Sequence, residues 1–191
     1  EAWQLETWSW LLRHLGGIED LRSSPLVTPT RTFFPPSDAL GHARAERIFD
    51  LVKHHARLDD WPCRLVPQPE KPQTRVGEFV QLKVEDGAQP FGTFSIEAGE
   101  AVITYDPDCL HTPTRLIPTF AHELAHYLLA SLREEPPGGV ENLEFATDLA
   151  TVYLGFGLFG ANDAFQFSQY QDTFSQGWST SGAGYLRERE W

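Results

Sequence analysis

The strongest constraint on the fold of this chain is an apolar helix, a short proline–glycine turn and a second apolar helix. Thr112 and Pro113 supply a cap and a first-turn proline, and the helix is expected to run to about Leu132. The segment EEPPGG (134–139) ends it, and VENLEFATDLATVYLGFG (140–157) reads as another helix. Because a short turn brings consecutive helices back alongside each other, we expect the two to pack antiparallel.

The first of these helices carries two histidines in the stretch FAHELAHYLL (120–129). Helical positions four apart share one face, so His122 and His126 can present ring nitrogens to one metal ion. Glu123 lies about 100° around the helix, beside such a metal rather than toward it, which suits a general base. The histidines stand apart from the apolar stripe of the helix, which consists of Leu116, Ile117, Phe120, Leu124, Leu128 and Leu132. The pattern therefore predicts a metal site with its own base.

A catalytic zinc ion needs a third protein ligand and one open position. His126 and Glu144 are expected at similar heights, roughly 9 and 6 Å from the turn between the two helices. Glu141 is three residues from Glu144, so either acid can in principle reach the metal. We favour Glu144, because Asp148 lies one turn beyond it and can accept a hydrogen bond from a ligand histidine. Glu141 is expected in the first turn of the helix, where the helix dipole explains a carboxylate.

These residues resemble the gluzincin zinc metallopeptidases, whose pattern is HExxH followed by a helix with ExxxD. HELAH (122–126) and EFATD (144–148) match it here. The similarity covers roughly residues 75 to 160 and looks close to the minimal, single-domain members, in which a few strands precede the HExxH helix. The resemblance implies a zincin-like fold and one Zn²⁺ per chain, bound by His122, His126 and Glu144. It also implies that Glu123 is the base and that Asp148 orients a histidine.

The resemblance further implies that substrate lies along an edge strand. The candidate is EAVITYD (100–106), just before the HExxH helix. The residue that would stabilise the oxyanion is not clearly marked. Its candidates remain open: Tyr105, His111, Tyr170 and Tyr185.

The rest of the chain favours an α+β fold with N-terminal helices. WQLETWSWLLRHLGG (3–17) has helical spacing, and Ser37 or Asp38 is expected to cap a second helix running to about Leu58. DDWPCRLVPQP (59–69) reads as a turn and a short strand. From Gly77 to Tyr105 the apolar period drops to two, which predicts a small antiparallel meander. Its strands would be EFVQLKV, PFGTFSIE and EAVITYD.

The chain is expected to form one compact domain. Residues 1–36 would be an N-terminal helix and proline-rich connector, and residues 37–191 a zincin-like metallopeptidase domain. The chain starts at Glu1 and has no methionine, which suggests a processed chain or a fragment of a longer one.

Composition excludes some classes of partner. The net charge of −12 over 191 residues argues against nucleic acid and anionic membrane surfaces. No apolar run approaches the roughly 18 residues that span a bilayer, and no signal peptide opens the chain. The two cysteines, Cys63 and Cys109, lack metal-site spacing and are expected to be buried, reduced thiols of a cytoplasmic protein, with a single disulfide between them as the alternative.

The sequence thus predicts a zinc-dependent peptidase acting on a peptide or protein substrate. Two alternatives remain: a zinc hydrolase of a non-peptide amide, and a regulatory or protein-binding domain built on a zincin fold. The N-terminal helix with Trp3, Trp8 and Trp10 is a candidate contact for a protein partner. GFGLFG (155–160) matches a dinucleotide-loop pattern, but it closes a helix, so we interpret it as a helix end with tight packing.

Overall fold

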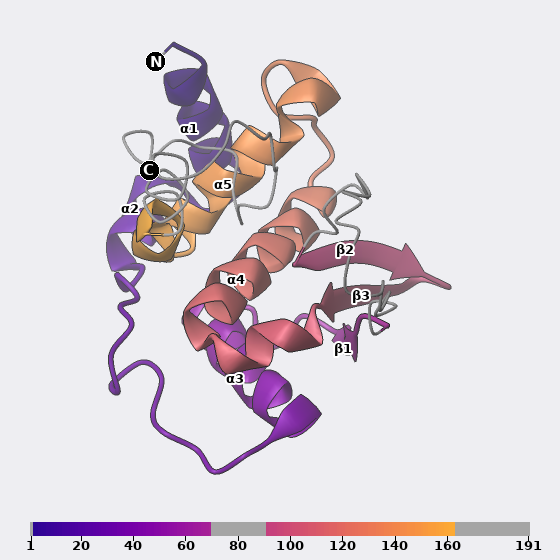
Figure 1. Cartoon of the computed structure of the whole chain (residues 1–191). Helices are drawn as coiled ribbons and strands as arrows, with labels where there is room; N and C mark the ends of the chain where they lie inside the picture. Colours follow the sequence, from indigo (N-terminus) through magenta and orange to yellow (C-terminus); the bar gives the residue numbers. More distant parts are fainter. Residues whose placement is uncertain (1, 70–90, 163–191) are drawn as a thin grey trace, which may run out of the picture.

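A computed structural model describes residues 2–69 and 91–162, which form a three-stranded sheet packed against helices (Figure 1). The predicted α+β class is confirmed. A further helical stretch starts at 157 and continues to the end of the described residues at 162. The elements are α1 (Ala2–His14), α2 (Gly17–Ser23), α3 (Gly41–His55), β1 (Cys63–Pro67), β2 (Gly92–Glu97), β3 (Glu100–Tyr105), η1 (Pro107–His111), α4 (Pro113–Ala130), η2 (Gly139–Asn142) and α5 (Leu143–Tyr153).

The sheet has the order β1-β3-β2. β2 and β3 pair antiparallel, as the meander predicts, but β1 pairs parallel with β3. β3 is therefore the central strand, and the expectation that residues 100–106 form an edge strand is wrong. Among the described strands β2 is an edge, and the predicted strand EFVQLKV (78–84) lies outside the described residues.

A two-residue turn joins β2 to β3. Ala98 and Gly99 both have positive φ, 51° and 86°. Such a turn twists the chain in the same sense as the paired strands, which is why it is favoured in hairpins. It fixes the register in which Phe94 faces Ile103.

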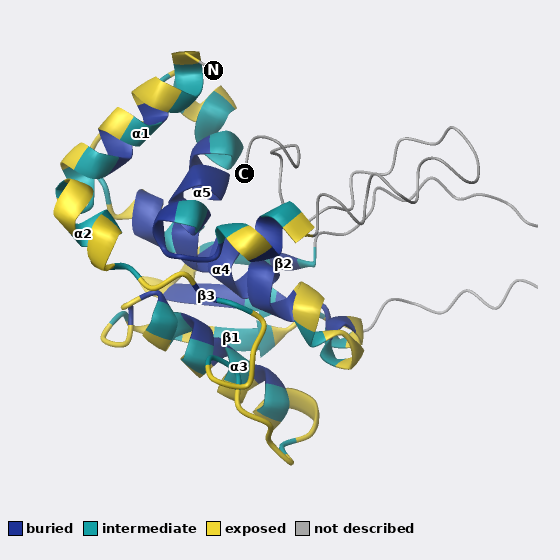
Figure 2. Ribbon diagram, turned by 90° about the vertical axis from the view of Figure 1, so that its left-hand side faces the viewer, coloured by how far each residue is buried: buried dark blue, intermediate teal, exposed yellow. Residues whose placement is uncertain are grey.

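α4 is the centre of the molecule and contacts β2, β3, α3 and α5. Figure 2 shows it buried among these elements. Pro113 occupies its first turn as predicted, whereas Thr112 makes no side-chain capping bond, and the helix ends at Ala130 rather than near Leu132. The ring of Phe120 packs edge-on against those of Phe49 and Tyr105, which joins α4 to α3 and β3.

The second predicted helix begins later than the sequence suggests. Gly138 and Gly139 both have positive φ, 88° and 71°, and the 3₁₀ turn η2, which starts at Gly139, comes before α5. Glu141 consequently lies in η2, so the expectation that it occupies the first turn of the helix is wrong. Glu144 occupies the first turn of α5 instead.

α5 ends where GFGLFG begins. Gly155 has a φ of 97°, and a Cβ atom there would collide with the backbone carbonyl of Pro25. The amide of Val27 donates to the carbonyl of Gly155 at 2.9 Å. The tight packing after the end of α5 is as predicted, but the stretch also opens a second helical segment at 157, which the sequence did not indicate.

The N-terminal helices pack onto α5. Trp10 is buried, and Trp3 stacks at a tilt on Phe145 with 5.4 Å between ring centroids. Trp8 is half-buried against the same core. The tryptophans thus pack within the chain, and a partner at this helix stays a prediction.

A polar cluster fastens α2 to α5 and to the end of α3. Arg57 donates to both carboxylate oxygens of Asp20, at 2.7 and 3.0 Å. The hydroxyl of Tyr153 lies 2.6 Å from Asp20 and 2.5 Å from the carbonyl of Leu15. α3 starts at Gly41, and Leu40 is the extended residue before it. The helix therefore begins later than the predicted cap at Ser37 or Asp38.

Both cysteines carry reduced thiols: Cys109 is buried and Cys63 half-buried. The expectation of two buried thiols is therefore wrong for Cys63, which lies on the edge strand β1. Within residues 2–69 and 91–162, no helix has the length and apolar character needed to cross a membrane.

Candidate metal centre

Three side chains predicted as metal ligands meet between α4 and α5. The Nε2 atoms of His122 and His126 are 3.1 Å apart. Oε2 of Glu144 lies 3.3 Å from each of them. The helix pair thus brings together the two histidines of one face of α4 and the acid in the first turn of α5. These three residues form the only such group of metal-ligating side chains in the described part of the chain.

A buried carboxylate orients the first histidine. Oδ1 of Asp148 lies 3.1 Å from Nδ1 of His122, and Asp148 is completely buried. A carboxylate accepts only, so Nδ1 carries the hydrogen, and in the neutral ring the lone pair is on Nε2, the atom that faces Glu144. The structure therefore puts Asp148 where the sequence predicts a partner of a ligand histidine.

Thr147 orients the second histidine. Its hydroxyl donates to the carbonyl of Leu143 at 2.9 Å, and its oxygen lies 3.3 Å from Nδ1 of His126. Since the hydroxyl hydrogen is already used, the oxygen accepts from Nδ1–H, and the lone pair of His126 is left on Nε2. The motif itself does not point to this residue, although Thr147 follows Glu144 by about one helical turn and so shares its face.

The three converging atoms are therefore all acceptors when both rings are neutral. Two imidazole lone pairs and a carboxylate oxygen at 3.1–3.3 Å repel one another unless a cation lies between them. A proton can bridge only two of these three acceptor atoms at a time, whereas a metal ion can bind all three.

The donor set and its spacing fit zinc. Zinc binds imidazole nitrogen and carboxylate oxygen at about 2.0–2.2 Å in tetrahedral sites, and ligand atoms in that geometry are about 3.4 Å apart. The observed separations of 3.1–3.3 Å are close to this value. The two supporting hydrogen bonds from Nδ1 complete the arrangement expected around zinc ligands.

The charges of the cluster follow from the same contacts. Burial lowers the pKa of His122, but hydrogen bonds with Asp148 and Glu144 and nearby carboxylate charges raise it more, to about 10. Hydrogen bonds with both histidines lower the pKa of Glu144 to about 2. Without a metal, the cluster therefore holds a proton on His122 and a negative charge on Glu144 at neutral pH.

Glu123 is buried next to the cluster, not inside it. Its exposed fraction is 7%, and burial raises its pKa, an effect that His122 and His126 oppose. A hydrogen bond from the Phe94 backbone holds the carboxylate against β2. Glu123 is thus a carboxyl group held in place with a raised pKa. Both properties suit a group that accepts a proton and later returns it.

Gly92 allows β2 to pass directly over this part of α4. A Cβ atom at Gly92 would lie 2.6 Å from a methyl carbon of Thr119 and 3.2 Å from Cγ of Glu123. Any side chain there would push the strand away from the helix. The close approach is what buries Glu123.

The other sequence candidates lie apart from the cluster. Glu141 is in η2, which precedes α5. The hydroxyl of Tyr105 lies 3.0 Å from Nδ1 of His42, and His111 is exposed at the end of η1. Tyr170 and Tyr185 lie outside the described residues.

Comparison with known proteins adds no relative. We found no match to the chain among protein-family models, curated proteins or solved structures.

Proposed function

We propose that this protein is a zinc-dependent peptidase with a zincin-like fold of the gluzincin type. The observation that carries the proposal is the triangle of His122 Nε2, His126 Nε2 and Glu144 Oε2, with sides of 3.1–3.3 Å. Each histidine has a partner at Nδ1, and Glu123 is buried beside the triangle. A cluster that only packs the core would not require three converging ligand atoms, two histidines held at Nδ1 and an adjacent buried carboxyl group.

The proposed chemistry divides between the metal and the chain. Bound zinc supplies Lewis acidity, which polarises a carbonyl group and brings the pKa of a water molecule close to neutral. Glu123 would accept a proton from a water molecule as the water oxygen adds to the carbonyl carbon, and would return that proton to the amine nitrogen that leaves when the C–N bond breaks. The raised pKa of Glu123 suits both steps, because the group must take and return the proton near pH 7.

The exposure of the cluster supports catalysis over a purely structural metal. The side chain of Glu144 is 39% exposed, while those of His122 and His126 are 10% and 17% exposed. One side of the triangle therefore faces solvent in the described part of the chain. A structural zinc site would instead be closed by a fourth protein ligand.

The substrate is proposed to lie along β2. Among the described strands this edge lies beside the site, since its Phe94 backbone bonds to Glu123. An extended peptide adds to such an edge through main-chain hydrogen bonds. The two reduced thiols suit a reducing compartment such as the cytoplasm.

Two alternative functions would use the same site residues in different ways. A hydrolase of non-peptide amides would use Glu123 identically and would differ only in substrate. A regulatory or protein-binding domain would keep the metal without turnover. The buried Glu123 favours hydrolysis, because a metal that only holds the fold together needs no base.

The test is cleavage by the zinc-loaded chain. Purified protein with one zinc per chain is incubated with denatured casein and a mixed peptide library, and new termini are read by mass spectrometry. We expect cleavage that stops when a chelator removes zinc and returns when zinc is restored. A zinc-loaded chain that cleaves neither would contradict the peptidase proposal.

A further inference from the structure

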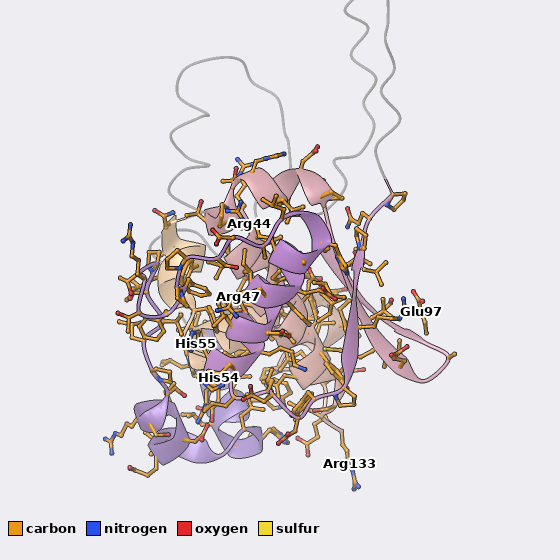
Figure 3. All side chains as sticks on the ribbon, turned by 90° about the horizontal axis from the view of Figure 1, so that it is seen from below. Arg44, Arg47, His54, His55, Glu97 and Arg133 are labelled. Atoms are coloured by element: carbon orange, nitrogen blue, oxygen red, sulfur yellow. The ribbon has the colours of Figure 1, made fainter. Side chains whose placement is uncertain are left out.

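A cavity of about 210 Å³ lies next to the candidate metal centre, and His126 forms part of its wall. Exposed residues of the segment after α4, including Arg133 and Glu134, form the rim, and Figure 3 shows Arg133 projecting away from the fold. The cavity therefore opens to solvent. Most of its remaining lining is apolar: Trp10, Phe94, Leu129, Leu132, Val140 and Leu143.

The volume of the cavity matches a single side chain. An engineered apolar cavity of about 150 Å³ admits benzene, whereas pockets for drug-sized ligands take about 300–1,000 Å³. A space of about 210 Å³ with apolar walls accordingly holds one leucine or phenylalanine side chain. The rest of such a ligand has to lie outside it.

We propose that this cavity binds a large apolar side chain, leucine or phenylalanine, of the substrate residue adjoining the cleaved peptide bond. This rests on the proposed function. His126 belongs to both the metal centre and the cavity wall, so a side chain in the cavity belongs to a residue beside the reacting carbonyl. Phe94 of β2 lies in the same wall, and its backbone contacts Glu123. A substrate peptide paired along β2 would therefore pass beside Glu123.

The N-terminal helix α1 completes this cavity, although it is far from the motif in sequence. Trp10 is 2% exposed and forms one wall. Nε2 of His14 lies 3.3 Å from Glu134, which ties the same helix to the rim. We therefore assign part of the substrate specificity to α1, which lies outside the segment that carries HExxH and ExxxD.

The experiment compares two dipeptide hydroxamates that differ only in one side chain, leucine or alanine. The hydroxamate group anchors each compound on the zinc of the loaded full-length chain, and calorimetry measures both affinities. We expect the leucine compound to bind at least about tenfold more tightly, the low end of what a filled apolar pocket discriminates. Cleavage of the two matching peptides is measured separately.

Two variants locate the preference. Val140→Trp fills the cavity from a residue that is 69% exposed, so it should abolish the leucine preference. Leu40→Trp adds the same side chain at a site 79% exposed and outside the cavity, and should change neither affinity. Trp10→Phe shortens the wall, so a third hydroxamate, which carries a phenylalanine side chain, should gain affinity relative to the leucine compound.

The outcomes separate this inference from the proposed function. Equal binding of the leucine and alanine compounds, or a preference that survives Val140→Trp, overturns the pocket. An unchanged leucine-to-phenylalanine ratio in Trp10→Phe overturns the part assigned to α1. A leucine preference without cleavage of either peptide upholds the pocket and overturns hydrolysis. A chain that takes up no zinc overturns both.

Discussion

The hydroxyl oxygen of Thr147 lies 3.3 Å from Nδ1 of His126 while its hydrogen is donated to the carbonyl of Leu143. Thr147 therefore acts on the ring of His126 only as an acceptor. It fixes the tautomer of a histidine that comes from a different helix.

Replacing Thr147 should weaken zinc binding without dismantling the fold. Thr147→Val keeps the shape but leaves Nδ1 of His126 without an acceptor, so we expect zinc affinity to fall about 10–100-fold. Thr147→Ser retains the hydroxyl and should stay close to wild type. Competitive chelator titration measures both variants, and equal losses in valine and serine variants would assign Thr147 a packing role instead.

Glu144 and Glu141 should differ sharply. Glu144→Ala removes one corner of the ligand triangle, so zinc should be lost at chelator concentrations that leave the wild type loaded. Glu141→Ala changes an acid in η2 outside the triangle and should retain zinc. Elemental analysis after dialysis against graded chelator decides the matter. Zinc loss in Glu141→Ala alone would show that the ligand assignment is wrong.

Glu123→Gln should abolish hydrolysis while leaving zinc in place. The amide keeps the size of the carboxylate but cannot accept the proton, so the rate should fall about 10²–10⁴-fold. Zinc content and the thermal unfolding midpoint are measured on the same sample. Wild-type turnover in this variant would exclude Glu123 as the base.

Zinc binding at pH 7 should release about one proton. In the metal-free chain the pKa of His122 is raised to about 10, so the ring is protonated at pH 7 and must lose that proton to bind zinc. Affinity should therefore rise by about tenfold per pH unit up to about pH 10. Calorimetry in two buffers with different ionisation enthalpies counts the proton. In Asp148→Asn, which removes the largest upward influence on this pKa, the release should be smaller.

The same pKa makes the metal-free fold sensitive to alkali. The folded pKa of His122 lies above the ordinary value of 6.5, so protonation stabilises the metal-free fold fully below pH 6.5. This stabilisation is lost as the pH rises toward 10. Denaturant unfolding of the metal-free chain at pH 6 and pH 10 measures it, and zinc-loaded protein should show no such loss from His122.

Gly92→Ala should destabilise the fold and disturb the base. The added Cβ would lie 2.6 Å from Thr119 and 3.2 Å from Glu123, so we expect a loss of about 1–3 kcal/mol in the free energy of unfolding. Hydrolysis should fall further than zinc affinity, because β2 positions Glu123 rather than the ligands. Gly157→Ala is the control, since its Cβ meets only Val152 side-chain carbons at 3.3 Å. Equal losses in both variants would contradict the role given to Gly92.

The sequence alone determined the helix that carries the histidines and the choice of acid that joins them. His122 and His126 share a face because helical geometry puts residues four apart on one side, whatever surrounds the helix. The same local rule placed Glu144 and Asp148 on one face of the next helix, and the turn between the two helices predicted that they would pack side by side. These inferences required no knowledge of distant parts of the chain.

The tertiary structure alone decided the strand neighbours of the site and the walls of its cavity. The alternating apolar pattern of a strand does not identify the strands with which it pairs. No local feature therefore indicated that β1 would pair with β3 and that β2 would lie beside Glu123. Trp10 reached the cavity because α1 packs onto α5, a contact between opposite ends of the described chain. Strand pairing and cavity walls depend on which distant surfaces bury each other, and that balance is a property of the whole fold rather than of any one segment.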